Sequence, residues 1–258
     1  RTNQDTVIIA PFNDLAAVTD LVQQHDDIAA IVLEPGGCLD DTVPSDPAFL
    51  RGLRELTRQK SIVLIFDEVV TGFRYARGGA QEYFGVTPDL TALGKVVGGG
   101  LPAGAIVGKA DVMGVLAWRP DPEWVRYRMV PHTGTWNANP GVAAAGIATL
   151  KLVRDTDVVE RAKRTTRMLV DGFNEVCKRL GIEAFAYTRS SIFKTKKGSP
   201  PRILSGDFSN HRSDADQLMA GWGATAPLIR KALLLEGIDL LRTDGYVSAV
   251  HTADDVEK

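Results

Sequence analysis

An apolar run that ends in two acidic residues most strongly constrains what this chain can fold into. Residues 62–66 read Ile-Val-Leu-Ile-Phe, and Asp67 and Glu68 follow directly. A short run of this kind is typical of a strand that is buried on both faces of a parallel sheet. Because ligands bind beyond the carboxyl ends of such strands, Asp67 is predicted to lie at a ligand-binding crevice.

A lysine among apolar residues and glycines follows further along the chain. Lys95 has Leu93, Gly94, Val96 and Val97 as neighbours. Burial favours a neutral amine, so we expect the pKa of Lys95 to be lowered and the amine to attack aldehydes. A surface lysine after a loop glycine is the alternative. A buried acid and a desolvated amine at one crevice suit pyridoxal 5′-phosphate (PLP), which needs a Schiff-base lysine and a partner for its pyridine nitrogen.

Strand-like and helix-like segments alternate over the first part of the chain. We expect strands at residues 7–10, 28–33, 62–66 and 103–107, and helices at residues 15–24, 47–60 and 111–116. Alternation of this kind predicts an α/β fold, with a mostly parallel sheet and helices on both faces.

The pattern changes at Pro140. Helices are expected at residues 140–153, 158–180 and 227–236, and short strands at residues 182–187, 202–207 and 238–241. This order predicts a small α+β domain after a larger one, with the division at residues 1–150 and 151–258. The basic residues Lys194, Lys196 and Lys197 are expected to lie in a solvated loop rather than in an anion site.

Composition excludes several classes of function. The chain has 258 residues, 44% of them hydrophobic, so it can bury a sizeable core. Its formal net charge of −2 argues against nucleic-acid binding, and no apolar stretch is long enough to span a membrane. Cys38 and Cys177 have no metal-site spacing, and we expect no metal. Two free, buried thiols fit a reducing, cytoplasmic compartment, although the chain starts at Arg1 and leaves a targeting segment open.

Several motifs, in order along the chain, resemble the class III PLP-dependent aminotransferases of fold type I. They are Phe66-Asp-Glu-Val-Val-Thr-Gly-Phe-Arg74, Pro88-Asp-Leu90, Gly94-Lys95, Gly98-Gly-Gly-Leu-Pro102, His132-Thr-Gly-Thr-Trp-Asn-Ala-Asn-Pro140, and the ending from Gly245 to Asp255. The Thr-Gly-Phe-Arg74 segment and Gly79-Ala-Gln81 are similar to glutamate-1-semialdehyde aminomutase and its relatives. Family members are considerably longer, so we expect this chain to be their C-terminal part, without the N-terminal portion.

The resemblance implies roles at three positions near the crevice. Lys95 would form the Schiff base and then move the proton between the substrate α-carbon and the cofactor. Asp67 would pair with the pyridine nitrogen; a helix cap or turn is its structural alternative. Val69 would pack on the cofactor ring, which is compatible with ordinary core packing.

The resemblance also implies a phosphate site and a partner. Gly134 and Thr135 would supply an amide and a hydroxyl to the phosphate of the neighbouring subunit, which implies a homodimer with shared active sites. A turn ahead of the Pro140 helix is the alternative reading of these two residues.

The sequence does not decide the roles of several other polar residues. Glu68 orients the site by hydrogen bonds or forms an ion pair, and Arg74 holds a substrate carboxylate or a salt bridge. A ligand role for Glu34 is unassigned, and His132 is expected to be structural. Gly94-Lys95 is not a P-loop, because Val96 stands where Ser or Thr is required, and Pro102 interrupts the glycine pattern that a dinucleotide site needs.

The expected function is PLP-dependent transfer of an amino group from a small-molecule donor to an acceptor. Aminotransferase and aminomutase chemistry share the first half-reaction, and no residue separates them. One alternative is a catalytically silent, incomplete part of such an enzyme, which acts at most as a dimerising or structural domain. This alternative arises because the family's first phosphate loop and ring-stacking aromatic residue would lie upstream of Arg1. A cofactor-free Schiff-base lyase would keep Lys95 but give Asp67 no ring to protonate.

Overall fold

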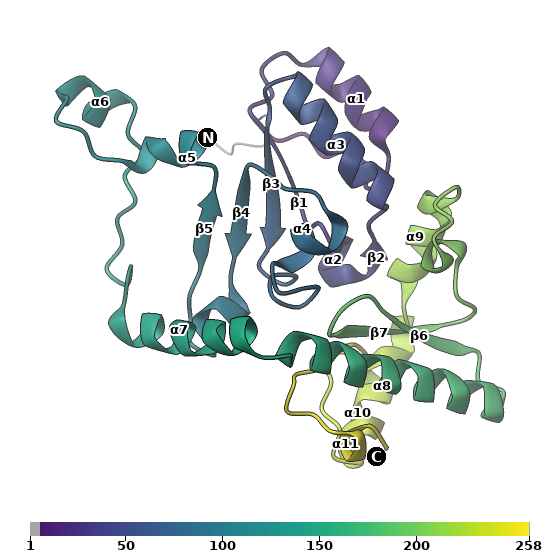
Figure 1. Cartoon of the computed structure of the whole chain (residues 1–258). Helices are drawn as coiled ribbons and strands as arrows, with labels where there is room; N and C mark the ends of the chain where they lie inside the picture. Colours follow the sequence, from purple (N-terminus) through teal and green to yellow (C-terminus); the bar gives the residue numbers. More distant parts are fainter. Residues whose placement is uncertain (1–5, 258) are drawn as a thin grey trace.

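The computed structural model describes residues 6–257, with the side chains of Leu39 and Asp40 excepted (Figure 1). Among these residues, the larger sheet has the strand order β1 (Ala30–Leu33), β3 (Val63–Glu68), β4 (Leu90–Leu93) and β5 (Ala105–Gly108). β1 and β4 both run parallel to β3, and β5 runs antiparallel to β4. The mostly parallel α/β fold is therefore confirmed, and β4 is a strand that the sequence pattern had not indicated.

Two helices pack on one face of this sheet. α1 (Leu15–Gln24) and α3 (Pro47–Gln59) contribute apolar side chains to a core that Leu64 and Phe66 of β3 complete. Alternation along β3 places Val63, Ile65 and Asp67 on the opposite face. On that face Val32 is 64% exposed and Ile106 is 57% exposed, so the helices that cover the sheet among residues 6–257 lie on one side.

The strand expected at residues 7–10 is wrong. Its backbone is irregular, and Val7 and Ile9 are 67% and 90% exposed. A strand needs a hydrogen-bonded neighbour, and no strand in the described part of the chain pairs with this segment.

A buried carboxylate holds the amino-terminal side of the sheet together. Asp89, just before β4, accepts hydrogen bonds from the Arg54 guanidinium at 2.9 Å and the Leu64 amide at 2.8 Å, and pairs with Lys109 at 2.6 Å. Burial raises the pKa of Asp89, but these three donors outweigh burial and hold the pKa below its usual value. One side chain thus ties α3, β3 and the end of β5 to the start of β4.

A long connection leads from the sheet to two consecutive helices. It contains α5 (Ala110–Met113), η3 (Gly114–Leu116) and α6 (Pro122–Tyr127) and extends away from the sheet in Figure 1. We call residues 109–139 the arm. α7 (Pro140–Asp155) then passes below the carboxyl ends of β3 and β4, and α8 (Val158–Leu180) continues to the second sheet. Both helices are confirmed, and Asn139 caps α7 by accepting from the amides of Gly141 and Val142.

The second sheet is small and antiparallel. Its strands are β6 (Ala184–Thr188), β7 (Ile192–Lys197) and β8 (Gly245–Tyr246), and α8 packs against it. The remaining short elements are α2 (Cys38–Asp41), β2 (Val43–Pro44), α4 (Gly79–Phe84), η2 (Lys95–Gly98), η4 (Arg202–Ser205), α9 (His211–Ala220), η5 (Gly223–Thr225), α10 (Ala226–Leu235) and α11 (Ala253–Glu257). Cys38 and Cys177 are free, and Cys38 is partly exposed rather than buried.

Two expected strands in this part of the chain are wrong. Residues 202–205 form η4 instead of a strand. Asp214 of α9 accepts a hydrogen bond from the Ile203 amide at 2.8 Å, and Gly206 ends η4 in a left-handed conformation. Residues 238–241 make an isolated bridge from Leu241 to Asp244 instead of a ladder.

The basic cluster is also not a solvated loop. Lys194 and Lys196 lie in β7 and are 5% and 6% exposed. Asp244 supplies the neutralising charge, at 3.3 Å from Lys194 Nζ and 3.9 Å from Lys196 Nζ. Burial of these cations is tolerated because their counter-charge, the partly buried Asp244, lies beside them.

A second buried carboxylate joins the two parts of the chain. The Tyr75 hydroxyl donates to Asp41 Oδ1 at 2.7 Å, and the Ser190 hydroxyl donates to Asp41 Oδ2 at 3.4 Å. Burial raises the pKa of Asp41 to about 6. The Tyr75 hydrogen bond and the charges of Lys194 and Arg189 oppose this rise, whereas the charge of Glu34 adds to it.

Asp41 should therefore make stability depend on pH. A folded pKa of about 6, above the unfolded value of 3.8, means that Asp41 contributes stability below pH 3.8 and loses it as pH rises through 6. Asp41→Asn should remove a component on the order of 3 kcal/mol between pH 4 and pH 7. Urea unfolding of wild type and variant across this range measures the difference. The exposed Asp26→Asn should retain the wild-type profile; parallel profiles for Asp41→Asn and wild type would contradict the assignment.

Candidate active site at the ends of β3 and β4

The parallel pairing of β3 with β4 places the predicted acid and lysine at the same end of the sheet. Asp67 lies opposite Ala92 and Glu68 lies opposite Leu93. Gly94 follows β4, and Lys95 then begins η2. The carboxyl ends of neighbouring parallel strands thus carry both residues, at the usual ligand-binding edge of an α/β sheet.

Gly94 lets the two strand ends approach closely. A Cβ atom at this position would lie 3.0 Å from Val69 Cγ1. The Val69 amide in turn donates to Asp67 Oδ1 at 3.0 Å. Val69 is therefore the contact between the end of β3, which carries Asp67, and the turn that carries Lys95.

Lys95 is held in an unusual backbone conformation. Its φ of 46° is left-handed, and Phe73 on the adjacent turn has a φ of 62°. Left-handed conformations of non-glycine residues cost about 1–3 kcal/mol, and they concentrate at functional sites. Close packing of α7 on η2 maintains the turn, since a Cβ at Gly146 would lie 2.6 Å from the Val97 carbonyl oxygen.

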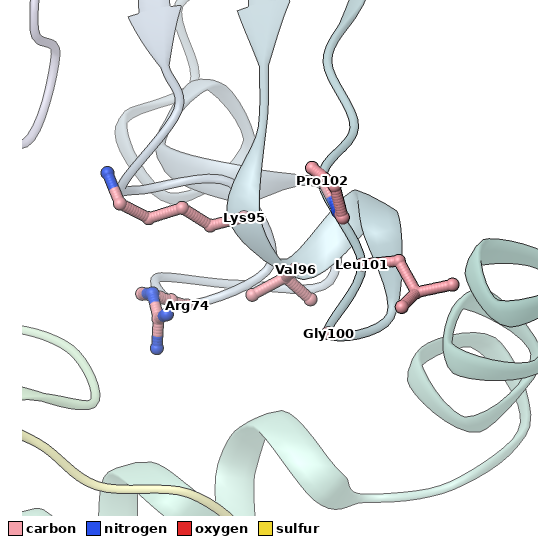
Figure 2. Close-up of a pocket in the computed structure, with 6 residues that line it drawn as sticks. All are labelled: Arg74, Lys95, Val96, Gly100, Leu101 and Pro102. Atoms are coloured by element: carbon pink, nitrogen blue, oxygen red, sulfur yellow. The ribbon is translucent and has the colours of Figure 1, made fainter. Parts of the chain in front are cut away.

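An open cleft of about 460 Å³ lies beside Lys95 (Figure 2). Its lining residues are Arg74, Lys95, Val96, Gly100, Leu101 and Pro102. The expected burial of Lys95 is wrong for this chain, because the cleft is open and the side chain is exposed. Asp67 and Val69 are half-buried next to the cleft without lining it.

Glu68 forms the structural anchor of the site. It is 1% exposed and accepts hydrogen bonds from the Thr71 hydroxyl at 3.0 Å, the Ala80 amide at 2.5 Å, and the Gln81 amide and side chain, both at 3.2 Å. These amides belong to the first turn of α4, where the helix dipole favours a carboxylate. Of the two roles left open for Glu68, the hydrogen-bonding role is the one observed.

Arg74 enters the cleft without an acidic partner. No ion pair or side-chain hydrogen bond joins Arg74 to any residue in the described range 6–257, and its buried Nε atom has no hydrogen-bond partner. Its guanidinium lies 5.0 Å from the centre of the Tyr246 ring. Burial lowers the pKa of Arg74 and the neighbouring Tyr246 opposes this, yet a guanidinium stays charged at neutral pH.

Gly134 and Thr135 lie apart from the cleft on the exposed arm. Neither residue lines the cleft, and both are exposed, as is His132. The Asn137 amide donates to the Gly134 carbonyl at 3.0 Å, so the segment forms a turn ahead of α7. The structure of one chain therefore brings Asp67, Val69 and Lys95 together and leaves Gly134 and Thr135 outside.

Comparison with known proteins identifies the family. The sequence profile described as aminotransferase class-III matches residues 2–184 of this chain. The chain belongs to the class III aminotransferase family.

Solved structures of this family share the fold. An ω-transaminase from Sphaerobacter thermophilus is 34% identical with a TM-score of 0.80, and the match covers 98% of this chain and 55% of that one. A β-phenylalanine aminotransferase from Variovorax paradoxus is 29% identical (TM-score 0.78, 97% and 54% covered). A glutamate-1-semialdehyde aminomutase from Pseudomonas aeruginosa PAO1 is 25% identical (TM-score 0.77, 95% and 53% covered). The chain spans about half the length of these class III proteins.

One feature of this site was not predicted from the sequence, and a second was left as one of two alternatives. The contact of Arg74 with Tyr246 joins residues far apart in the sequence, and no local pattern indicates it. The sequence did contain a signal for the anchoring role of Glu68, in the residue types at Gly79 and Gln81. Gly79 leaves room for the Glu68 carboxylate, and the Gln81 side chain donates a hydrogen bond to it. A Cβ at Gly79 would lie 2.4 Å from Glu68 Oε2, and Gln81 also bonds Thr91 of β4 at 3.3 Å.

The Glu68 anchor predicts unequal effects at two glycines of α4. Gly79→Ala would force a side chain onto Glu68 at a φ of +79°, whereas Gly85→Ala meets open space at a φ of +65°. We expect Gly85→Ala to lower the free energy of unfolding by about 1 kcal/mol and Gly79→Ala by about 3 kcal/mol or more. Urea denaturation of both variants measures the difference. Equal losses would show that Glu68 does not constrain this turn.

Proposed function

We propose that this chain carries the lysine-bearing half of a PLP-dependent enzyme that transfers an amino group between small molecules. The observation that carries the proposal is the left-handed Lys95 at the end of β4, beside Asp67 at the end of β3. Family membership supports it, since class III aminotransferases use PLP. Aminotransferase and aminomutase chemistry both remain compatible with these residues.

The residues at the strand ends fit the cofactor. Among residues 6–257, Asp67 has one hydrogen bond, from the Val69 amide to Oδ1, and no cation within ion-pair distance. Its second carboxylate oxygen can accept from a protonated pyridine nitrogen. Lys95 presents an exposed amine to the cleft, and Val69 lies between the two as an aliphatic surface. PLP, when bound, supplies an electron sink for bonds at the carbon that carries the amino group.

Each of these residues would have one task. Lys95 would bond covalently to the cofactor aldehyde, and after an incoming amine displaces it, the freed amine would move a proton at the substrate α-carbon. Asp67 would keep the pyridine nitrogen protonated through a charge-assisted hydrogen bond. Val69 would pack against the ring and help to exclude water from it.

The arm supports a homodimer with shared active sites. Trp118, Tyr127 and Trp136 on the arm are 70%, 71% and 81% exposed, and aromatic side chains gathered on a protruding segment favour burial against a partner. In such a dimer the arm would carry Gly134 and Thr135 toward the phosphate at the neighbouring chain's site. We further propose that residues 1–150 and 151–258 act as a cofactor-binding and a small domain, and that the enzyme is cytoplasmic, in line with its two free cysteines.

One observation favours a second candidate function. Lys95 is exposed, so this chain alone does not desolvate its amine. An incomplete, catalytically silent piece that dimerises or completes a fold would show the same exposure. The two candidates differ in whether the isolated chain bonds PLP.

Titration with PLP tests the cofactor proposal. The wild-type chain should develop the visible absorbance of a lysine-bound cofactor, and Lys95→Ala should lose it because the amine after the end of β4 is removed. Lys151→Ala, at an exposed position of α7, should retain the band. A band that persists in Lys95→Ala contradicts the assigned lysine, and no band in the wild type favours the silent candidate.

Sedimentation equilibrium tests the dimer. We expect the chain to sediment as a dimer, and Trp136→Ser to shift it toward monomer because the arm loses its most exposed aromatic side chain. Leu235→Ser, at the 87% exposed end of α10, is the matched control and should leave the dimer intact. A monomeric wild type, or the same shift in both variants, would contradict the shared-site proposal.

A further inference from the structure

The connection from β1 to α3 packs against the small sheet. The Tyr187 hydroxyl donates to the Thr42 carbonyl at 2.6 Å, and the Arg189 guanidinium donates to the Ser45 carbonyl at 2.8 Å. Val43 of the connection is buried in an apolar cluster that β6 helps to form. This connection therefore joins the larger sheet to the small one.

Asp41 is buried in this interface and is 7% exposed. Its Oδ1 accepts from Tyr75 of the turn after β3 at 2.7 Å, and its Oδ2 accepts from Ser190 of the β6–β7 turn at 3.4 Å. The two oxygens thus bind opposite sides of the interface. A cavity of about 10 Å³ lies beside the carboxyl, between Pro44 of the connection and Ile192 of β7. It has room for roughly one water molecule, so the closed interface gives the carboxyl little solvation.

Tyr75 links Asp41 to the wall of the cleft beside Lys95. Its ring is fully buried and packs against Phe84 of α4, with 5.8 Å between ring centres. The Gly36 carbonyl is a second acceptor for its hydroxyl, at 3.3 Å. A buried hydroxyl is costly when its acceptor is lost, so separation of Asp41 from Tyr75 disturbs the turn. Arg74, which lines the cleft, precedes Tyr75 directly.

The titratable groups that face Asp41 come from several elements. They are Glu34, Tyr75, Tyr187, Arg189 and Lys194. Burial raises the pKa values of both tyrosines, so they stay neutral, and Lys194 is also paired with Asp244 at 3.3 Å. Burial dominates at Asp41 too and raises its pKa to about 6. If the interface separates, water solvates the carboxyl and the pKa returns toward 3.8.

We propose that Asp41 is a pH-dependent switch that controls how firmly the small sheet is held to the turn beside the cleft. The neutral carboxyl favours the closed interface, and the ionised carboxylate favours local separation because water solvates it. A rise in pH therefore loosens the turn that carries Arg74, without unfolding of the larger sheet. The inference does not depend on PLP binding, so it applies to both candidate functions.

Hydrogen exchange of the full chain, followed by mass spectrometry of peptides, tests the switch. The reporter peptides cover residues 34–46 and 71–78, and the reference peptide covers residues 48–58 of α3. Protection factors correct for the intrinsic pH dependence of exchange. Those of both reporters should fall about tenfold between pH 5 and pH 7.5, because separation becomes more favourable as Asp41 ionises. The reference peptide should be more protected than either reporter at both pH values.

Three variants identify the group responsible. Asp41→Asn keeps the shape without the ionisation and should abolish the tenfold change in both reporters. Tyr75→Phe should abolish it in residues 71–78 alone, because the link from Asp41 to the turn is lost.

Asp14→Asn is the matched control, since Asp14 pairs with Arg212 of α9 and also caps α1. The Ala17 amide and Arg212 lower the pKa of Asp14, so it stays ionised over this range, and asparagine caps a helix equally well. Asp14→Asn should therefore retain the tenfold change.

Three results would overturn the inference. They are equal reporter protection at pH 5 and pH 7.5 in the wild type, a tenfold change that persists in Asp41→Asn, and reference and reporter peptides with the same protection and the same change. The last result would mean that the chain opens only by unfolding as a whole. If Asp41→Asn does not fold, the wild-type profile and Tyr75→Phe decide: an unaltered change at residues 71–78 in Tyr75→Phe contradicts the link to the cleft.

Discussion

The parallel pairing of β3 with β4 is the constraint on which the site depends. Its register puts Asp67 opposite Ala92, so the turn after each strand emerges at the same edge of the sheet. Two buried carboxylates hold this pairing from its two ends. At the amino-terminal end of β4, Asp89 accepts a hydrogen bond from the Leu64 amide of β3. At the carboxyl-terminal end of β3, Glu68 accepts hydrogen bonds from the Ala80 and Gln81 amides of α4. Asp89 and Glu68 thus fix the backbone, while Asp67 and Lys95 form no ion pair among residues 6–257.

The left-handed backbone and the proposed Schiff-base lysine coincide at the same residue. Lys95 keeps a left-handed backbone because Gly94 admits Val69 on one side and α7 packs against η2 on the other. Such packing over-determines the conformation and offsets its local cost. The conformation directs the lysine into an open cleft instead of the core, and Arg74 reaches the same cleft from the turn after β3.

Local patterns in the sequence predicted β3, one of the two strands that define the site, but they did not indicate β4. Long-range contacts explain several of the failures. The apolar run at 62–66 and the helix at 158–180 carry their own periodicity, and both are observed. Lys194 and Lys196 looked solvated because their counter-charge, Asp244, lies far away in the sequence. Burial of Lys95 was inferred from its apolar neighbours, but burial depends on every surrounding wall and not on adjacent residues alone.

Chemical mapping of the bound cofactor tests the central claim most directly. The chain is incubated with PLP, the adduct is reduced with borohydride, and the labelled peptide is identified by mass spectrometry. We predict that the label lies on Lys95 and falls sharply in Asp67→Ala, because the acid at the end of β3 holds the ring next to the lysine at the end of β4. Label spread over surface lysines, or no label on Lys95, would contradict the claim that these two strand ends form one site.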